Sequence, residues 1–369
     1  MGSTDASKPR LLSLDALRGF DMFWIIGGDA FFRSLAEVTN WGWARAWAAQ
    51  LEHVEWAGFH FYDLIFPLFM FISGVAIPFS LLAKAEAAAD KRPIYIKLVK
   101  RALLLVLLGF VYNHLTDLSF ATQRYASVLG QIGLAYLFAG LIMLSVKTLK
   151  GRLAALSGIL LGNAVIQLLV PVPGIGAGVL TPEGSVNGFI DRLLLPGRLY
   201  DGVFDPEGVL CVLSATAVTL MGGLAGLVLK SDKFAAYRKT LILAASGVGL
   251  TTLGYVLGNW YPIIKKAWTS TFDIYAAGLS FVLLAMFYLV IDVWKVRGWS
   301  FVFRVIGLNS ITIYLGTRMV DFDFTSKFWF GGLARLAGGA GALVLLAGTI
   351  VIEWLVLYAL YKKNVFLRV

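Results

Sequence analysis

The sequence predicts an all-α polytopic membrane protein, built as a bundle of about ten transmembrane helices. Of its 369 residues, 59% are hydrophobic and only 15% are charged, whereas roughly a quarter of the residues of a soluble domain are charged. The apolar residues come in long blocks, each near the roughly 20 residues that a helix needs to cross the bilayer core. Together these observations exclude an ordinary soluble protein, a disordered chain and a fibrous repeat.

Ten apolar segments carry this prediction, and each is long enough for about one crossing. They span residues 11–32, 57–83, 98–116, 125–146, 153–171, 208–229, 240–258, 270–291, 301–319 and 338–361. The first and the ninth are the least regular, because charged residues interrupt their apolar runs. The second is rich in aromatic residues and contains Pro67, and the third ends at His114, close to Asp117.

The first segment has the character of a retained helix rather than a cleavable signal. It holds Asp15, Arg18 and Asp21 and lacks a small-residue cleavage site. These residues share one side of a helix, where Asp15 and Arg18 can pair and so lock the helix into the bundle. Asp29 follows near the outer end and has no local partner in this interpretation, so we expect it to be functional.

The charges of the loops predict the orientation of the chain. About two thirds of the 32 Lys and Arg residues fall on the side that carries both termini. Because Lys and Arg mark the cytoplasmic side, we expect both termini in the cytoplasm. Acidic residues gather in the opposite, outer loops, where a cationic substrate would meet a favourable field. Simple tolerance of acids on that side explains the pattern equally well.

We expect a single domain over residues 1–369. The longest outer loop, at about 172–207, is rich in Gly and Pro and would form a lid or rim. No internal repeat is evident, which argues against a transporter built from duplicated halves. The single cysteine, Cys211, excludes a disulfide framework and a Cys-based metal site. We attribute the net charge of +10 to the Lys and Arg residues of the loops, which set the orientation of the chain in the membrane. We therefore expect no nucleic-acid partner.

Histidine is the side chain best suited to act as a base at neutral pH. The chain has three: His53, His60 and His114. His53 lies between Glu52 and Glu55, which could orient it or favour its protonated form. The alternative is an ordinary histidine at the membrane interface. A metal site at His53 and His60 lacks a third clear ligand, so we expect no metal. We expect His114 to pair with Asp117, one turn further on.

The segment that begins at His53 carries a specific motif. Residues 53–74 read H-x-x-W-x-G-x4-D-L-x-F-P-x-F-x-F-I-x-G. This segment resembles the signature of the heparan-α-glucosaminide N-acetyltransferase family, whose bacterial members are transmembrane glucosamine N-acetyltransferases. Further matching pieces follow the family order over nearly the whole chain: S-L-D-A-L-R-G at 13–19, F-D-P-E-G at 204–208, W-Y-P-I-I-K-K-A-W-T-S at 260–270 and G-L-N-S at 307–310.

The resemblance implies a transfer of acetyl from cytosolic acetyl-CoA to the amine of a terminal glucosamine on the far side of the membrane. It places the family's catalytic histidine at His53. Members commonly carry an Asn ten residues after the R-G of the first motif, and this chain has Asp29 there. Unlike Asn, Asp29 can carry a charge, so it could bind the substrate ammonium or share its proton.

Amide formation from a thioester requires a deprotonated amine, a stabilised oxyanion and a leaving thiolate. His53 could act as the base or could hold the acetyl group as a nucleophile, and both routes remain open. We expect His53 and Asp29 to be the catalytic residues. The residues expected on the acceptor side are Glu55, Trp56, Asp63, Asp205, Glu207, Trp268 and Asn309. For the tryptophans an aromatic belt, and for Asn309 an interhelical contact, are open alternatives.

The CoA phosphates should meet basic residues on the cytoplasmic side. The candidates are Lys97, Lys100, Arg101, Arg238 and Arg304, although basic residues there also serve as topology signals. No Walker or Rossmann pattern occurs, so the pantetheine arm would enter between helices. Small residues such as Gly222 and Gly226 could line that seam or allow close helix packing. Lys265 and Lys266 are expected on the outer side. They could bind an anionic sugar or lipid headgroup, or they could simply extend their charged ends to the membrane surface.

Two other functions remain open. An amino-sugar transporter would explain the polar residues inside the membrane but not the motif at His53. An acyltransferase for another cell-envelope acceptor would explain both. We expect a bacterial-type plasma (inner) membrane, with membrane lipid, acetyl-CoA and an amino sugar as partners. A homodimer is compatible with the sequence, which does not fix the oligomeric state.

Overall fold

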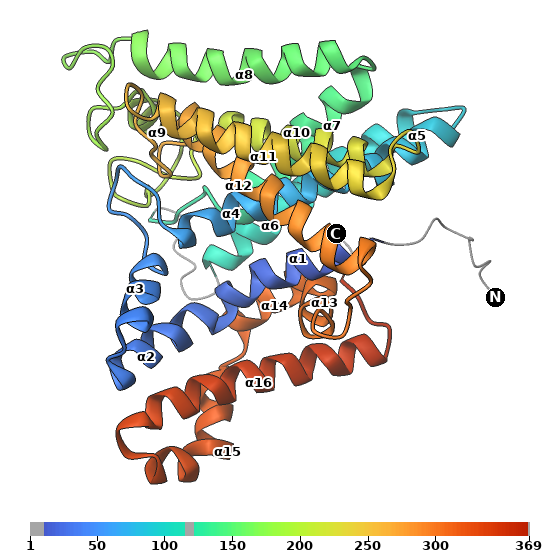
Figure 1. Cartoon of the computed structure of the whole chain (residues 1–369). Coiled ribbons are helices and arrows are strands. Elements are labelled where there is room, and N and C mark those ends of the chain that lie inside the picture. The colour runs from blue at the N-terminus through green and yellow to red at the C-terminus, as the bar shows by residue number, and fades with distance from the viewer. Residues whose placement is uncertain (1–10, 115–121, 368–369) are drawn as a thin grey trace.

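The computed structural model describes residues 11–114 and 122–367, and all of their regular secondary structure is helical (Figure 1). Asp117, the expected partner of His114, lies outside the described residues. The helices in chain order are α1 (Leu12–Phe23), η1 (Trp24–Gly28), α2 (Asp29–Thr39), α3 (Gly42–Gln50), α4 (Phe61–Val75), η2 (Pro78–Leu82), α5 (Ala83–Ala87), α6 (Arg92–His114), α7 (Val128–Ser145), α8 (Leu149–Leu169), α9 (Val186–Leu194), α10 (Val209–Lys230), α11 (Ala236–Leu257), α12 (Ser270–Phe287), η3 (Tyr288–Val293), α13 (Phe301–Leu308), α14 (Ser310–Met319), α15 (Phe322–Leu336), η4 (Gly338–Ala340) and α16 (Gly341–Lys362).

Within the described residues, 7 helical stretches are long and apolar enough to cross a membrane. They are Phe61–Ala87, Val128–Ser145, Leu149–Leu169, Val209–Lys230, Ala236–Leu257, Ser270–Val293 and Gly338–Lys362. Each corresponds to one of the predicted segments. The chain is therefore a multi-pass membrane protein, as the composition predicts.

The three remaining predicted spans do not meet this criterion. The first is interrupted at η1, where Ile26 and Gly27 leave helical geometry. The third lies in α6, whose first turns are basic and leave a short apolar stretch. The ninth is divided at Asn309 into α13 and α14. All three nevertheless belong to the bundle, since α1 packs against α13 and α6 packs against α7.

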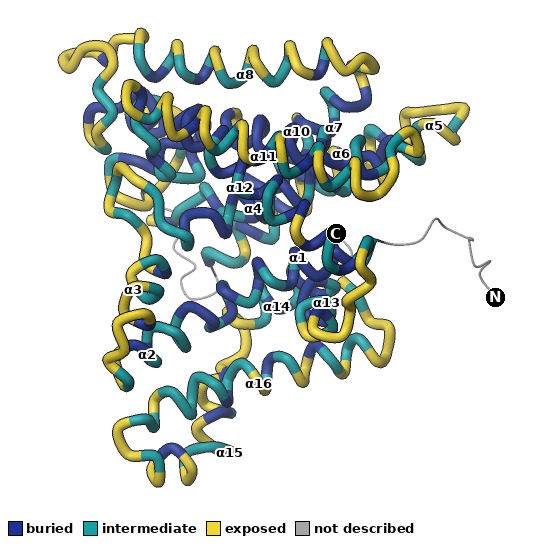
Figure 2. Tube along the Cα trace, viewed as in Figure 1, coloured by how far each residue is buried: buried dark blue, intermediate teal, exposed yellow. Residues whose placement is uncertain are grey.

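The bundle is centred on α10, which contacts α4, α7, α8 and α12. α8 and α16 cover opposite outer sides of the bundle and expose much of their apolar surface (Figure 2). In a membrane protein such surface faces lipid.

Glycines bring the central helices together. A Cβ added at Gly222 of α10 would lie 2.0 Å from the carbonyl oxygen of Phe71 in α4. A Cβ at Gly226 would lie 2.4 Å from the carbonyl oxygen of Val75. Gly222 and Gly226 thus allow close packing of α10 on α4, which was one of the two roles open for them.

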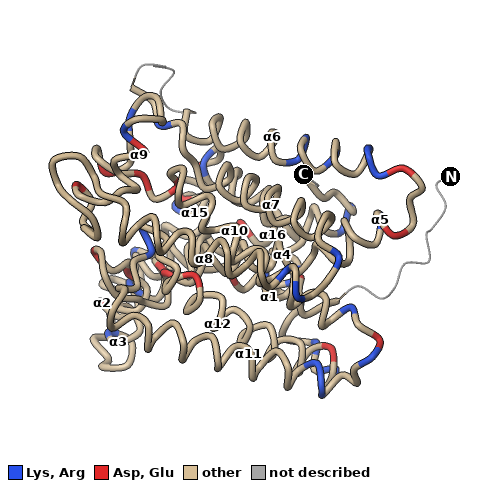
Figure 3. The backbone as a smooth tube through the Cα atoms, turned by 90° about the horizontal axis from the view of Figure 1, so that it is seen from above, with Lys and Arg blue, Asp and Glu red and all other residues tan. Residues whose placement is uncertain are grey.

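The charged residues gather mainly toward the two ends of the helices (Figure 3). Both ends of the described chain lie at the same end of the bundle (Figure 1).

The segment 172–207 is more ordered than a bare lid, because it contains α9. Ser185 caps that helix by accepting a hydrogen bond from the Gly188 amide at 3.2 Å. Asp191 at its end accepts the Val209 amide at 3.0 Å and so fixes the start of α10. Trp56 donates through its indole N–H to the Leu180 carbonyl at 2.6 Å, which ties the segment to the motif at His53.

Candidate active site

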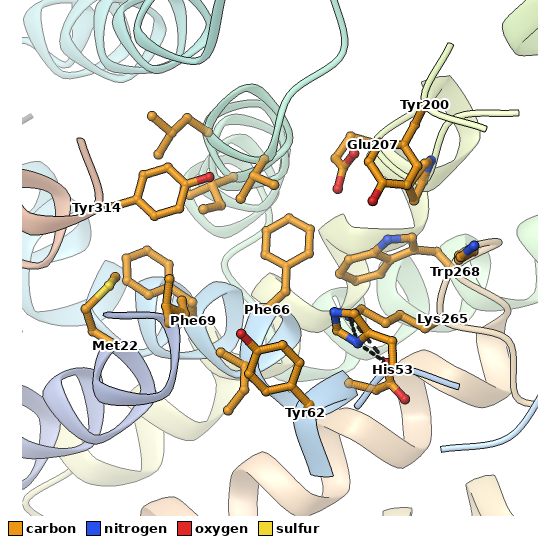
Figure 4. Close-up of a pocket in the computed structure, with 18 of the residues that line it drawn as sticks. Met22, His53, Tyr62, Phe66, Phe69, Tyr200, Glu207, Lys265, Trp268 and Tyr314 are labelled. Atoms are coloured by element: carbon orange, nitrogen blue, oxygen red, sulfur yellow. Dashed lines mark hydrogen bonds and ion pairs between the residues drawn. The ribbon is translucent and has the colours of Figure 1, made fainter. Parts of the chain in front are cut away.

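A cavity of about 310 Å³ opens between the start of α4, the loops around residues 200–207 and 265–268, and helices α7 and α14 (Figure 4). Most of its wall is aromatic or aliphatic, including Phe66, Phe69 and Trp268. Its polar groups include His53, with Asp63 and Lys265 beside it, and Glu207. A mostly apolar cavity with a few convergent polar groups is the usual form of a small-molecule site.

Asp63 holds the imidazole of His53. The Asp63 side chain is fully buried, and its Oδ1 lies 2.7 Å from His53 Nδ1. Its Oδ2 accepts the backbone N–H of His60 at 3.0 Å, because Asp63 occupies the first turn of α4 and caps it. Since a carboxylate only accepts hydrogen bonds, Nδ1 must carry the proton. His53 therefore presents a basic Nε2, and its side chain stays about half exposed (49%).

Lys265 is the third member of this cluster. Its ammonium nitrogen lies 3.0 Å from His53 Nδ1, 3.3 Å from His53 Nε2 and 3.4 Å from Asp63 Oδ1. Burial lowers the pKa of Lys265, while the Asp63 carboxylate opposes that effect. The loop before α12 places it there, because the Gly58 amide donates to the Ile263 carbonyl at 2.9 Å. The two neighbouring lysines therefore have different partners, since Lys266 forms an ion pair with Asp201 at 3.1 Å.

A second polar cluster lies across the cavity. Arg124 donates from Nε and Nη2 to the two oxygens of Asp205, at 2.8 and 2.6 Å, and also pairs with Glu207. Asp205 is buried behind Arg124 and also accepts the amides of Tyr200 and Glu207, so its oxygens are occupied. Glu207 lines the cavity. Burial raises the pKa of Glu207 to about 7, although Arg124 favours its ionised form.

Trp268 forms a fixed part of the wall. Its backbone is left-handed, with φ of 46°, a conformation that non-glycine residues seldom adopt. Its carbonyl accepts hydrogen bonds from Asn163 Nδ2 at 3.0 Å and from Ser214 Oγ at 2.8 Å, which hold it in place. The indole ring lies edge-on to Phe66 and Phe272. Trp56 lines the same cavity.

Several predicted site residues lie elsewhere. Glu55 is exposed and does not line the cavity. Asn309 lies at the break between α13 and α14 and does not line the cavity; its Nδ2 donates at 3.3 Å to the carbonyl of Val365, in the segment that follows α16. Asp29 does have a local partner, contrary to our expectation, because Arg33 donates to it at 2.7 Å. Asp29 also interacts with the hydroxyl of Tyr62, whose ring packs on His53.

A smaller cavity of about 300 Å³ adjoins the first and shares Phe69 and Ile311 with it. Arg18 and Arg101 line it. The guanidinium of Arg101 lies 4.1 Å from the centre of the Tyr136 ring. Arg18 forms the predicted ion pair with Asp15, at 3.7 Å.

Of the five predicted CoA-binding residues, Arg101 alone lines this second cavity; Lys97, Lys100, Arg238 and Arg304 do not. Over residues 11–114 and 122–367, no group of at least three His, Cys, Asp or Glu side chains is placed to hold a metal.

Sequence analysis did not assign Lys265, Arg124, Tyr62 or Arg18 to the site. Lys265 had a signal, since it is a basic residue close to Trp268 on the side predicted to be outer and acidic. Arg124 had none that spacing alone could show, because its partner Asp205 is distant in sequence. Tyr62 lies within the motif, directly before Asp63, but is one of the positions that the motif leaves unspecified.

The fold and the cavity thus define a multi-pass membrane protein with a His–Asp–Lys cluster at the mouth of an apolar pocket. Residues 10–171 match a family model described as a domain of unknown function, DUF5009. The chain is 26% identical, over 99% of its length, to heparan-alpha-glucosaminide N-acetyltransferase of Homo sapiens. It is 27% identical, over 92% of its length, to the protein of the same name from Mus musculus.

The chain is therefore distantly homologous to these N-acetyltransferases, and the resemblance seen in its motifs is confirmed. The aligned part covers about 60% of the length of each relative.

Proposed function

We propose that this protein is a transmembrane acetyltransferase that moves acetyl from cytosolic acetyl-CoA to the amine of glucosamine or of a terminal glucosaminide. The observation that carries this proposal is the His53–Asp63–Lys265 cluster at the cavity, in a chain homologous over nearly its whole length to proteins named for that reaction.

The cluster supplies the groups that the reaction needs. With Nδ1–H bound to Asp63, His53 Nε2 takes a proton from the acceptor nitrogen. That nitrogen attacks the thioester carbonyl, the new C–N bond forms, and the C–S bond breaks to release CoA. Lys265 lies close to Nε2 and would stabilise the negative charge that develops on the carbonyl oxygen. The same Nε2 could instead carry the acetyl group between the two substrates, so either route uses this geometry.

The acceptor would bind between Glu207, Trp56 and Trp268, all of which line the cavity. An ionised Glu207 would attract the substrate ammonium, and the indole rings would contact the sugar ring. Asp205 acts from behind by holding Arg124. Asp29 would act through Tyr62 rather than by direct contact.

The donor would approach through the second cavity. Arg18 and Arg101 would meet the CoA phosphates, and the pantetheine arm would pass between α7 and α14 toward His53. This route would begin beside Phe366 and Leu367, which line the second cavity, and so at the end of the bundle that carries both chain termini (Figure 1). A donor made in the cytosol could then react without crossing the membrane.

The topology in this proposal keeps all ten spans, with α1–α2, α6 and α13–α14 as the three less regular crossings. Both termini lie in the cytoplasm, and residues 1–369 form one domain in a bacterial-type plasma membrane. The excess of Lys and Arg on the side of the termini supports this orientation.

The test is acetyl transfer by purified protein in neutral detergent, with labelled acetyl-CoA and glucosamine. Wild type should transfer acetyl, while His53→Ala should lose about 10²–10⁴-fold in turnover and keep its affinity for acetyl-CoA. His60→Asn is the matched control and should stay active, because His60 does not line the cavity. Full activity in His53→Ala would refute the assignment of His53.

The same assay separates the other functions. Acetyl-CoA binding without transfer to glucosamine would direct the search to other envelope acceptors. Sealed vesicles that take up glucosamine unchanged, with no binding of acetyl-CoA, would favour a transporter.

A further inference from the structure

A third cavity, of about 500 Å³, lies between η1, the end of α14, the start of α15 and the middle of α16. Most of α16 is of intermediate exposure (Figure 2), and its buried residues are Gly348, Glu353 and Leu357. Of these, Glu353 lines the cavity. None of the residues of the His53 cluster does.

Glu353 is the feature that requires explanation. It lies 12 residues into α16, roughly 18 Å from its start at the usual helical rise, and therefore deep in a helix able to span a membrane. Its residue is 3% exposed, and its Oε2 has no hydrogen-bond partner in the described part of the chain. An ionisable group at that depth is costly, so it marks a functional site unless it is paired.

The rest of the cavity wall is also acidic. Asp323 lies in the first turn of α15, accepts a hydrogen bond from Thr349 Oγ1 at 2.8 Å, and acts on Glu353 through its like charge. Asp321 adds a third carboxylate, against one cation in the wall, Arg318. The cavity therefore favours a positively charged occupant.

The break in the first helix supplies further acceptors. Gly27, with φ of +119°, and Ile26 leave helical geometry where η1 meets the cavity. Interrupted helices free backbone carbonyls, and membrane proteins use such carbonyls to bind cations. Gly27 also packs on α16, since a Cβ there would lie 3.5 Å from Ile350.

The remaining wall is apolar and opens toward lipid. Ile25, Leu346 and Ile350 line it, and Met319 at the rim is 68% exposed. Among the described residues no three His, Cys, Asp or Glu side chains are placed to hold one metal ion together, and the volume of the cavity exceeds that of a bare ion. These features fit an amine attached to a hydrocarbon chain better than they fit a metal.

We propose that this cavity binds the protonated amine of an amphiphile, with Glu353 and Asp323 around the ammonium group and the hydrocarbon chain along η1 and α16. Binding would pair a buried carboxylate with a buried cation, and this pairing would offset the free-energy cost of burying each charge. The proposal is independent of the acetyl-transfer reaction.

The experiment uses the full chain in a neutral maltoside detergent and measures saturable binding of labelled dodecylamine. Unlabelled dodecylamine should displace the label, whereas dodecanol, with the same chain and no charge, should not. Glu353→Gln should weaken binding by more than about tenfold, because the buried carboxylate is lost. Asp323→Asn should weaken it as well, and Glu37→Gln, at an exposed site on α2, should leave it unchanged.

The outcomes are distinct. Saturable binding that needs Glu353 or Asp323 supports the proposal even if one of the two variants fails to fold. Displacement by sodium chloride alone, or by dodecanol, would overturn it in favour of an inorganic cation or an apolar pocket. Absence of saturable binding, with Glu353→Gln as stable as wild type, would identify Glu353 as a neutral carboxylic acid and would also overturn the proposal.

Discussion

At the residue scale, the site depends on the way in which Asp63 fixes the proton of His53. Asp63 caps α4 through the His60 amide and binds His53 Nδ1, so one carboxylate both begins the helix and sets the tautomer. This double role explains why the motif spaces His and Asp by ten residues.

Replacing Asp63 with Asn should separate these two roles. The asparagine side chain would retain an acceptor for the helix cap but could donate to Nδ1, which favours the wrong tautomer. We expect kcat to fall by about 10²–10⁴-fold with an almost unchanged KM for acetyl-CoA. The measurement is steady-state acetyl transfer, with Glu52→Gln as the exposed control. Wild-type kcat in Asp63→Asn would show that the tautomer has another source.

The charge of Glu207 predicts a pH dependence. Its pKa is raised to about 7, so Glu207 loses its charge as the pH falls through that value. If the carboxylate holds the substrate ammonium, KM for glucosamine should rise below pH 7 in wild type. In Glu207→Gln, KM for glucosamine should be high throughout and should not show the rise below pH 7. A wild-type pH profile of KM in the variant, with Glu183→Gln as control, would contradict the role.

Sequence reasoning found part of this site because the motif is local. His53, Trp56 and Asp63 lie within one short stretch, and the resemblance added Glu207 and Trp268. It did not place Lys265 beside His53, because that contact forms between two loops that are far apart in the chain. Asp29 was misjudged for a simpler reason: Arg33, one helical turn away, is visible in the sequence.

At the scale of elements, the bundle depends on close backbone contact between α4 and α10. Gly222 faces the Phe71 carbonyl of α4, while its neighbour Gly223 faces the flexible side chain of Met143, with the nearest atom 3.3 Å from an added Cβ. Two adjacent glycines on one helix thus meet different neighbours.

This difference predicts unequal effects of the same substitution. Gly222→Ala should destabilise the protein by about 1–3 kcal/mol or more, since neither backbone can move easily. Gly223→Ala should have a much smaller effect, because the Met143 side chain can shift. Thermal unfolding in detergent, read as Tm, checks both, and equal losses would show that the α4–α10 contact is not rigid.

Hydrophobic run length predicted the spans well where the helix is regular. It was less informative at η1 and at Asn309, because a run of apolar residues does not reveal where the backbone leaves helical geometry. Both interruptions border a cavity: Ile26 and Gly27 line the acidic one, and Ser310 lines the one that holds His53.

At the scale of the whole molecule, both chain ends lie at one end of the bundle, and the loop between α3 and α4, which carries His53, lies at the other (Figure 1). The charge asymmetry of the loops predicts which end is cytoplasmic, and the packing of the helices alone does not. The all-helical class followed from composition, whereas the pairing of helices did not, because every lipid-facing surface is also apolar.

Cysteine labelling in intact cells tests this orientation. The natural thiol, Cys211, is buried and should not react. A membrane-impermeant maleimide should label Glu37→Cys from outside and should label Asp232→Cys only after lysis. Both positions are exposed, so access depends on the membrane alone. The reverse pattern would invert the topology and remove the cytosolic route for the donor.

The hydrogen bond between the Gly58 amide and the Ile263 carbonyl joins the segments that carry His53 and Lys265. These two side chains are 212 residues apart in the chain. A ribosome would therefore insert the histidine into the membrane long before the lysine emerges. The nascent protein would remain chemically inert until most of its helices had entered the bilayer, and would gain its reactive cluster only as the last third of the chain arrives.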